Sequence, residues 1–435
     1  MREGREVYEA LDLALRIGEV LLSSGAGAAD VTATMVAVTS ACGVHNVSAD
    51  VTSVDLTLHH QPSPGEPAAL QVRRVARREV DYAALTEVDQ TVADLVAGRL
   101  TREEARDRVA QIVSTGHARH QWAVTLGWGM LGTGLALTLG GTALVCGLAF
   151  VAACLIHWTR LLMAPLRIPT FYVQAAGGFV ATLVAVGAAA THAELNPSRV
   201  VTVGIVMLLS GIGLMGAMQD ALHGFPVTAS ARLLTAILDT AGDDAGVSAG
   251  LSVGTLLGVE LGTFKPGAAG LAEAGVAVFG AALAAAAFAY ASYAPARSLA
   301  AVAFVGALGQ GVELAVARTQ LGSTWGSAVA AITIGGICYL VAARFRVPPL
   351  VVVVPAIVPL LPGLAIYKGL ALLATGEDGV LQLASALATA VALAAGVILG
   401  QYVARPLKRE AERLETRLAG PRMVGLLRRN GKTRS

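Results

Sequence analysis

The sequence predicts a mainly α fold: a polytopic helical membrane protein with about ten transmembrane helices and a small soluble α+β domain in front of them. Of its 435 residues 55% are hydrophobic and only 14% are charged, too little charge to coat a water-soluble body of this size. The mean hydropathy is +0.64. Aromatic residues make up only 5% of the chain, and the abundant alanine and glycine favour close helix packing in lipid.

Residues 1–120 are predicted to form the soluble domain, because no apolar run in them approaches the roughly 20 residues needed to cross a bilayer. Leu11, Leu15 and Leu22 recur at helical spacing between charged residues, which predicts an amphipathic helix and not a signal peptide. Asp30 is the expected N-cap of the second helix. We expect helices at 7–23, 30–42, 81–97 and 101–114, and strands at 44–51, 54–59 and 70–75.

Apolar runs separated by short polar or proline breaks follow from Trp122 onward. We expect membrane helices near 122–139, 141–158, 170–190, 200–218, 230–262, 270–290, 299–317, 326–343, 349–373 and 381–404. Residues 121–263 would form a first membrane half, 264–404 a second half and 405–435 a basic tail. The loops on the side of the soluble domain are richer in arginine, including Arg160, Arg167 and Arg232, so the positive-inside rule predicts a cell membrane protein with both termini cytoplasmic.

An internal repeat is indicated by two pairs of similar segments. Residues 208–214 resemble 360–366, and Gly258-Val-Glu-Leu-Gly262 resembles Gly396-Val-Ile-Leu-Gly400. These pairs align five helices with five. Because five is odd, the second half would enter the membrane from the opposite side, which gives two inverted five-helix repeats of the kind found in many secondary transporters. Chance similarity between segments rich in alanine, glycine and leucine is the alternative.

The ninth expected helix contains Pro355, Pro359 and Pro362, and proline removes a backbone donor and strains the preceding turn. We therefore expect helical hydrogen bonding to be interrupted between Pro355 and Gly363. Ser210-Gly-Ile-Gly213 is a weak helix at the corresponding point of the first half, and paired interruptions point to a transporter's central site. Simple kinks are the alternative. The predicted substrate-binding residues are Ser210, Gly211, Gly213, Pro359, Pro362, Gly363 and Tyr367.

Acidic residues within apolar spans are costly and therefore suggest a function. The candidates for carrying a coupling proton are Asp243, Asp244, Glu260 and Glu313; the last two alternatively reach interfacial water. Asp220 fits an inner loop better. Glycine recurs every four residues from Gly242 to Gly262, a pattern that predicts close approach of another helix backbone.

Catalytic and metal-binding patterns are weak. Gly246-Val-Ser-Ala-Gly250 formally matches a nucleophile elbow, but it lies within an apolar helix and not at a strand-to-helix turn. The four cysteines are scattered without metal-ligand or disulfide-framework spacing, and no dinucleotide or phosphate-loop fingerprint occurs. We expect no enzyme, no cofactor, no metal and no nucleic-acid partner.

The ordered motifs of the chain resemble the threonine/serine exporter family, in the form that joins both membrane halves in one chain. The resemblance is found at 14–44, 77–89, Arg167-Ile-Pro-Thr-Phe-Tyr-Val-Gln174, 211–232 and 355–363. It thus spans nearly the whole chain. One departure is Ser210-Gly211, which stands where the second half has Pro362-Gly363.

This resemblance implies a cytoplasmic N-terminal domain, a ten-helix membrane region and export of threonine and serine driven by the proton motive force. The implied partners are the amino-acid substrate, protons and the lipid bilayer, and a homo-oligomer is left open. Two other classes stay open: a channel or importer for another small polar solute, and a membrane-anchored regulatory scaffold.

Overall fold

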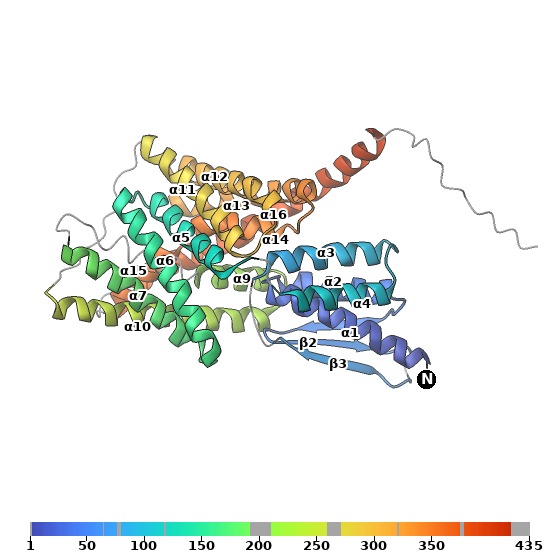
Figure 1. Cartoon of the computed structure of the whole chain (residues 1–435). Helices are drawn as coiled ribbons and strands as arrows, with labels where there is room; N and C mark the ends of the chain where they lie inside the picture. The colour runs from blue at the N-terminus through green and yellow to red at the C-terminus, as the bar shows by residue number, and fades with distance from the viewer. Residues whose placement is uncertain are drawn as a thin grey trace, which may run out of the picture.

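The computed structural model describes residues 2–63, 65–75, 80–116, 119–191, 210–258, 271–319, 322–374 and 378–418. A small α+β domain lies at one end of a larger bundle of helices, and the C-terminal helix extends beyond the bundle (Figure 1). The architecture is mainly helical with one three-stranded sheet, as the sequence predicts.

The N-terminal domain packs helices on one face of an antiparallel sheet of order β1-β2-β3. Its elements are α1 (Arg2–Ser23), α2 (Ala28–Ala41), β1 (Val47–Val51), β2 (Asp55–His60), β3 (Ala69–Arg74), α3 (Tyr82–Val96) and α4 (Arg102–Thr115). Leu11, Met35 and Leu56 are fully buried in its core. Gly18 allows α1 to approach α2, because an added Cβ there would lie 2.6 Å from the Met35 sulfur. The three strands lie within a few residues of their predicted ranges.

The start of α2 differs from the prediction. Gly27, not Asp30, is the N-cap, and it has no side chain to accept a hydrogen bond. The Ala28 amide instead donates to Asp220 Oδ1 at 2.9 Å. Exposed amides and the helix dipole make a helix N-terminus favourable for a carboxylate, so a residue of the helix bundle caps a helix of the N-terminal domain.

The bundle contains α5 (Gln121–Thr138), α6 (Ala143–Met163), α7 (Thr170–Thr191), α9 (Ser210–Leu222), α10 (Pro226–Leu256), α11 (Leu271–Ala291), α12 (Ala296–Ala317), α13 (Gly322–Phe345), α14 (Leu350–Ile357), α15 (Gly363–Ala374) and α16 (Val380–Leu418). Six of the segments described are long and apolar enough to cross a membrane: Ala143–Leu166, Thr170–Ala190, Glu273–Ala291, Ala296–Ala317, Gly322–Phe345 and Val380–Ala404. The count of ten stays a prediction. Parts of the fourth and fifth expected spans lie outside the described residues.

Helices pack in a similar order in the two parts of the bundle. α5 contacts α6 and α6 contacts α7, as α11 contacts α12 and α12 contacts α13, while α7 packs along α10 and α13 along α16. The α7–α10 pair and the α13–α16 pair lie on different sides of the bundle (Figure 1). α5 packs against α11 and thereby joins the two parts.

The glycine row of α10 lies against α7, as its spacing predicts. A Cβ added at Gly246 would collide with the Ala175 carbonyl, and one at Gly250 would meet Thr182. In α16, a Cβ added at Gly396 or Gly400 would likewise collide with a carbonyl of α13. By these contacts, Gly246 and Gly250 of α10 are the counterparts of Gly396 and Gly400 of α16. The sequence comparison instead matched Gly258, which follows the end of α10 and faces open space, and Gly262, which is outside the described residues.

The expected break near Pro355–Gly363 is present. α14 continues through Pro355 and ends at Ile357, a 3₁₀ turn (η2) covers Val358–Leu360, and Leu361 is extended, with ψ 139°. Helical structure resumes at Gly363 in α15. In the first half, Ser210–Gly213 is helical as the beginning of α9, and the residues before it lie outside the described part of the chain.

Candidate functional site

A cavity of about 560 Å³ lies beside the break between α14 and α15. Its walls come from α12, α13, η2, α15 and α16, and the lining includes Glu313, Ser327, Pro359, Pro362, Lys368 and Gln382. Ligand pockets for small molecules are typically about 300–1,000 Å³. The cavity is therefore large enough for a small polar metabolite, and the proline break forms part of its wall.

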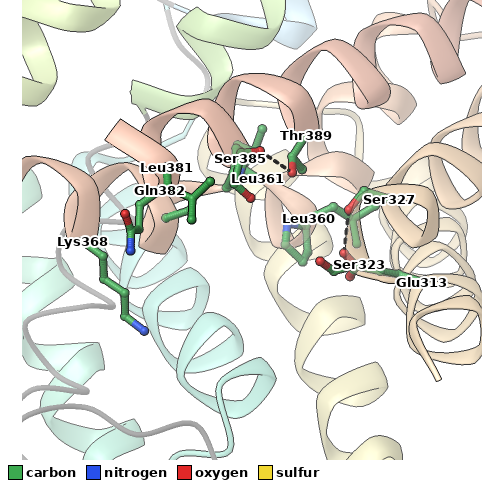
Figure 2. A pocket seen from close by; sticks show the side chains of 13 residues that line it. Glu313, Ser323, Ser327, Leu360, Leu361, Lys368, Leu381, Gln382, Ser385 and Thr389 are labelled. Carbon is green, nitrogen blue, oxygen red and sulfur yellow. Dashed lines mark hydrogen bonds between the residues drawn. The ribbon is translucent and has the colours of Figure 1, made fainter. Parts of the chain in front are cut away.

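Glu313 on α12 supplies a carboxylate to this cavity, and both of its oxygens have a hydrogen-bond donor. Ser327 Oγ donates to Oε1 at 2.8 Å, and Gln310 Nε2 donates to Oε2 at 2.9 Å. Ser327 and Gln310 are themselves buried. Figure 2 shows Glu313 beside Ser323 and Ser327 at one end of the cavity. One hydrogen bond from the preceding turn of α12 and one from α13 fix the carboxylate at the cavity wall.

The same partners can satisfy Glu313 with and without a proton. A serine hydroxyl both donates and accepts, whereas the amide nitrogen of Gln310 only donates. The carboxylate accepts from both neighbours. A proton placed on Oε1 would donate to Ser327 Oγ, while Oε2 would continue to accept from Gln310. A proton can thus be gained or lost without leaving a buried polar group unpaired, which would cost about 1–3 kcal/mol.

The other end of the cavity carries Lys368 of α15 and Gln382 of α16 (Figure 2). The Gln382 Oε1 atom is buried and accepts no hydrogen bond from the residues that the structure describes. Pro362 and Ala365 line the cavity, so the first turn of α15 borders it, and unpaired amides at a helix N-terminus attract anions. The cavity therefore combines an acidic end with groups suited to a carboxylate and to a hydrogen-bond donor.

The structure brings together only some of the predicted site residues. Pro359, Pro362 and Glu313 line the cavity, and Gly363 is buried at the start of α15. Tyr367 belongs to α15, but its side chain is outside the described part of the structure. The same holds for the side chain of Ser210 and for the whole of Glu260. Of Gly211, only its place in α9 is described. None of the residues described on α9 or α10 lines this cavity.

Asp243 and Asp244 instead belong to α10, and Asp243 joins a second polar cluster with α6 and α7. Arg160 Nη2 donates to Gln174 Oε1 at 2.8 Å, and Arg160 interacts electrostatically with Asp239 and Asp243. Asp243 is 1% exposed, and within the described part of the chain neither of its carboxylate oxygens has a hydrogen-bond partner. We call Arg160, Gln174, Asp239 and Asp243 the first-half cluster.

The assignment of Arg160 to an inner loop was wrong, because α6 continues to Met163, several residues beyond the expected helix end. Gln310, Ser327 and Gln174 were also missed. Each is a polar side chain in an otherwise apolar helix, and each lies three or fourteen residues from the charged group that it contacts. A polar side chain in an apolar helix is a signal that the sequence offers. It indicates a contact with a particular charged residue only when the packing of the helices is known.

Metal binding finds no support in the part of the chain that the structure describes: no three histidine, cysteine or acidic side chains are grouped there. The four cysteines are free. The membrane-length helices define a multi-pass helical membrane protein, and a polar cavity lies beside its broken helix.

Comparison with known proteins agrees with this class and narrows it. Residues 12–254 match the family model described as "Putative threonine/serine exporter", and residues 277–403 match "Threonine/Serine exporter, ThrE". The chain belongs to the threonine/serine exporter family. It is 35% identical to a "Probable threonine/serine exporter" of Mycobacterium tuberculosis (98% of this chain, 82% of the relative). It is 34% identical to a "Threonine/serine exporter" of Corynebacterium glutamicum (93% and 84%). No solved structure matches.

Proposed function

We propose that this chain is a secondary transporter that exports threonine and serine across the cytoplasmic membrane, driven by the proton motive force. The family and the two relatives support the substrate class. The observation that carries the mechanism is the Glu313 carboxylate in the cavity beside the broken helix.

In this mechanism a proton and the substrate ammonium compete for Glu313. The ionised carboxylate holds the ammonium, the first turn of α15 takes the substrate carboxylate, and hydroxyl groups of the cavity wall such as Ser385 contact the substrate hydroxyl. Protonation of Glu313 removes the charge that holds the ammonium and releases the substrate. Because one carboxylate serves both ligands, substrate leaving the cell is exchanged for protons entering it.

Alternating access would come from two inverted five-helix halves. Similar packing of α7 on α10 and of α13 on α16 supports this arrangement. At the end of the bundle near the N-terminal domain, Arg119 donates to the Tyr290 carbonyl and Arg297 donates to the Phe345 and Arg346 carbonyls. The Arg346 carbonyl also accepts from Gln90 of that domain. Basic residues gathered at that end support a cytoplasmic N-terminal domain.

The test is transport by purified protein in proteoliposomes. Unlabelled internal threonine should accelerate uptake of labelled threonine, because a carrier exchanges substrate faster than it returns empty; a channel shows no counterflow. A proton gradient should also drive net threonine flux, and Glu313→Gln should remove that gradient-driven flux. Glu273→Gln is the matched control, since Glu273 is an exposed carboxylate at the start of α11.

Three results contradict the proposal in different ways. Flux without counterflow indicates a channel. Absence of any threonine or serine flux indicates another solute or a scaffold. Gradient-driven flux that is equal in Glu313→Gln and wild type removes Glu313 from the coupling step while leaving the transport activity itself in place.

A further inference from the structure

The first-half cluster occupies the same positions in its helices as the Glu313 site does in the second half. Arg160 and Glu313 are 153 residues apart, and so are Gln174 and Ser327, so the Arg160–Gln174 hydrogen bond corresponds to the Glu313–Ser327 hydrogen bond. Each bond joins residues 14 positions apart on consecutive helices.

The helix contacts around the two sites also repeat, with an offset of 153 residues between α7 and α13 and of 150 residues between α10 and α16. Gly246 lies against the Ala175 carbonyl, and Gly396 against the Ala328 carbonyl, again 153 residues after Ala175. When α10 is aligned with α16 through these glycines, Asp239 corresponds to Thr389, which lines the cavity. The two clusters are thus equivalent in position, although one contains a cation and two carboxylates and the other a single carboxylate.

Asp243 gives the first-half cluster a buried carboxylate that is suited to binding a cationic group. Its carboxylate is 1% exposed, and neither oxygen has a hydrogen-bond donor among the described residues, although buried polar atoms nearly always have a partner. Arg160 on α6 is the nearby cation, Asp239 and Asp244 are the neighbouring acids on α10, and Gln174 faces them from α7. A positive donor would satisfy Asp243.

We propose that the first-half cluster is a second amino-acid site, in which Arg160 binds the carboxylate of a zwitterion and Asp243 binds its ammonium. A guanidinium presents paired donors to a carboxylate, and a carboxylate pairs with an ammonium, so both ends of one small molecule are matched. The inference rests on the proposed function, since it takes the same substrate class to a site other than the Glu313 cavity.

A local probe is built into the fold. The Trp128 ring stacks on His157, with centroids 5.9 Å apart, and His157 is one helical turn before Arg160 on α6. The other three tryptophans, Trp122, Trp158 and Trp325, are exposed on the bundle surface. Replacing these three with phenylalanine leaves Trp128 as the single fluorophore next to the first-half cluster.

The experiment titrates this full-length single-tryptophan protein in nanodiscs with threonine and with threoninamide, which keeps the ammonium but has no carboxylate charge. We expect a saturable change in Trp128 emission with roughly tenfold or greater preference for threonine, the scale of a charged hydrogen bond. Arg160→Gln should reduce the preference below roughly threefold. Arg167→Gln, an exposed arginine after α6, should retain it, as should Glu313→Gln.

Should Arg160→Gln fail to fold, Asp243→Asn tests the other charge. This substitution should weaken the binding of threonine but not that of 2,3-dihydroxybutanoate, in which a hydroxyl replaces the ammonium. The inference is wrong if threonine counterflow is intact but Trp128 does not respond, or if Arg160→Gln weakens threonine and threoninamide equally. It is also wrong if Glu313→Gln alone abolishes the response. Absence of counterflow in the wild type contradicts the proposed function instead.

Discussion

One buried ion pair helps to attach the N-terminal domain to the first part of the bundle. Asp220 is 1% exposed, and its Oδ2 lies 2.9 Å from Arg232 Nη1. Arg232 Nη2 donates to the Ala26 carbonyl at 3.0 Å, and Ala28 donates its amide to Asp220 Oδ1. The pair thus holds the backbone on both sides of Gly27, which is the entry to α2.

Removing Asp220 leaves the Arg232 charge buried and the α2 amide without an acceptor. Breaking one partner of a buried pair costs about 3–5 kcal/mol, and losing a helix cap costs about 1 kcal/mol. For Asp220→Ala we expect amides at the start of α2 to exchange with solvent on the order of 10²–10³ times faster, up to the limit set by global unfolding. Asp220→Asn keeps an acceptor for the Ala28 amide, so exchange at the start of α2 should increase less than in Asp220→Ala.

The measurement is hydrogen–deuterium exchange of the full-length protein in detergent or nanodiscs, followed at α2. The control is Asp94→Ala, which removes an exposed pair with Arg99 in the same domain, because such pairs contribute at most about 1 kcal/mol. If Asp220→Ala changed exchange at α2 no more than Asp94→Ala does, the ion pair would not hold the domain, and the reasoning would be refuted.

Three further predictions test packing, hydrogen bonding and thiol chemistry. Gly246→Ala should destabilise the bundle because its Cβ meets the Ala175 carbonyl, whereas Gly147→Ala, in open space on α6, should not; thermal unfolding followed by size-exclusion chromatography compares them. Ser327→Ala should reduce proton-driven threonine flux, and Ser327→Thr should restore it because threonine keeps the hydroxyl. Burial raises the pKa of the Cys42 thiol, so less thiolate is present at neutral pH, and alkylation of Cys42 at pH 7.5 should be slower than in the urea-unfolded protein.

Local signals predicted the mainly helical fold and the break between α14 and α15. The prolines at 355, 359 and 362 remove donors wherever the segment lies, so the interruption does not depend on its neighbours. Likewise the glycine row of α10 requires a close partner. Neither signal identifies the partner, and the matching of Gly258 with Gly396 failed for that reason: similar glycine spacing recurs along α10, and only contact with α7 fixes the register.

Charged residues were harder to place, because their roles come from helices distant in sequence. Asp220 is 192 positions from the amide that it caps. The sequence alone predicted that Arg160 and Arg232 lie in loops, whereas they lie in α6 and α10. Asp243 and Glu313 looked equivalent as acids within apolar spans. The fold separates them into two clusters with different partners.

The N-terminal domain contacts both parts of the bundle, and these contacts constrain how the parts can move relative to each other. It is bound to the first through Asp220, Arg232 and Thr228. It is bound to the second through the Tyr82 amide, which donates to the Ser292 carbonyl, and through Gln90, which donates to the Arg346 carbonyl. A rocking motion that separated the parts at this end would break one set of bonds. Opening at the end with the domain therefore requires the domain to undock from one part, whereas opening at the far end does not.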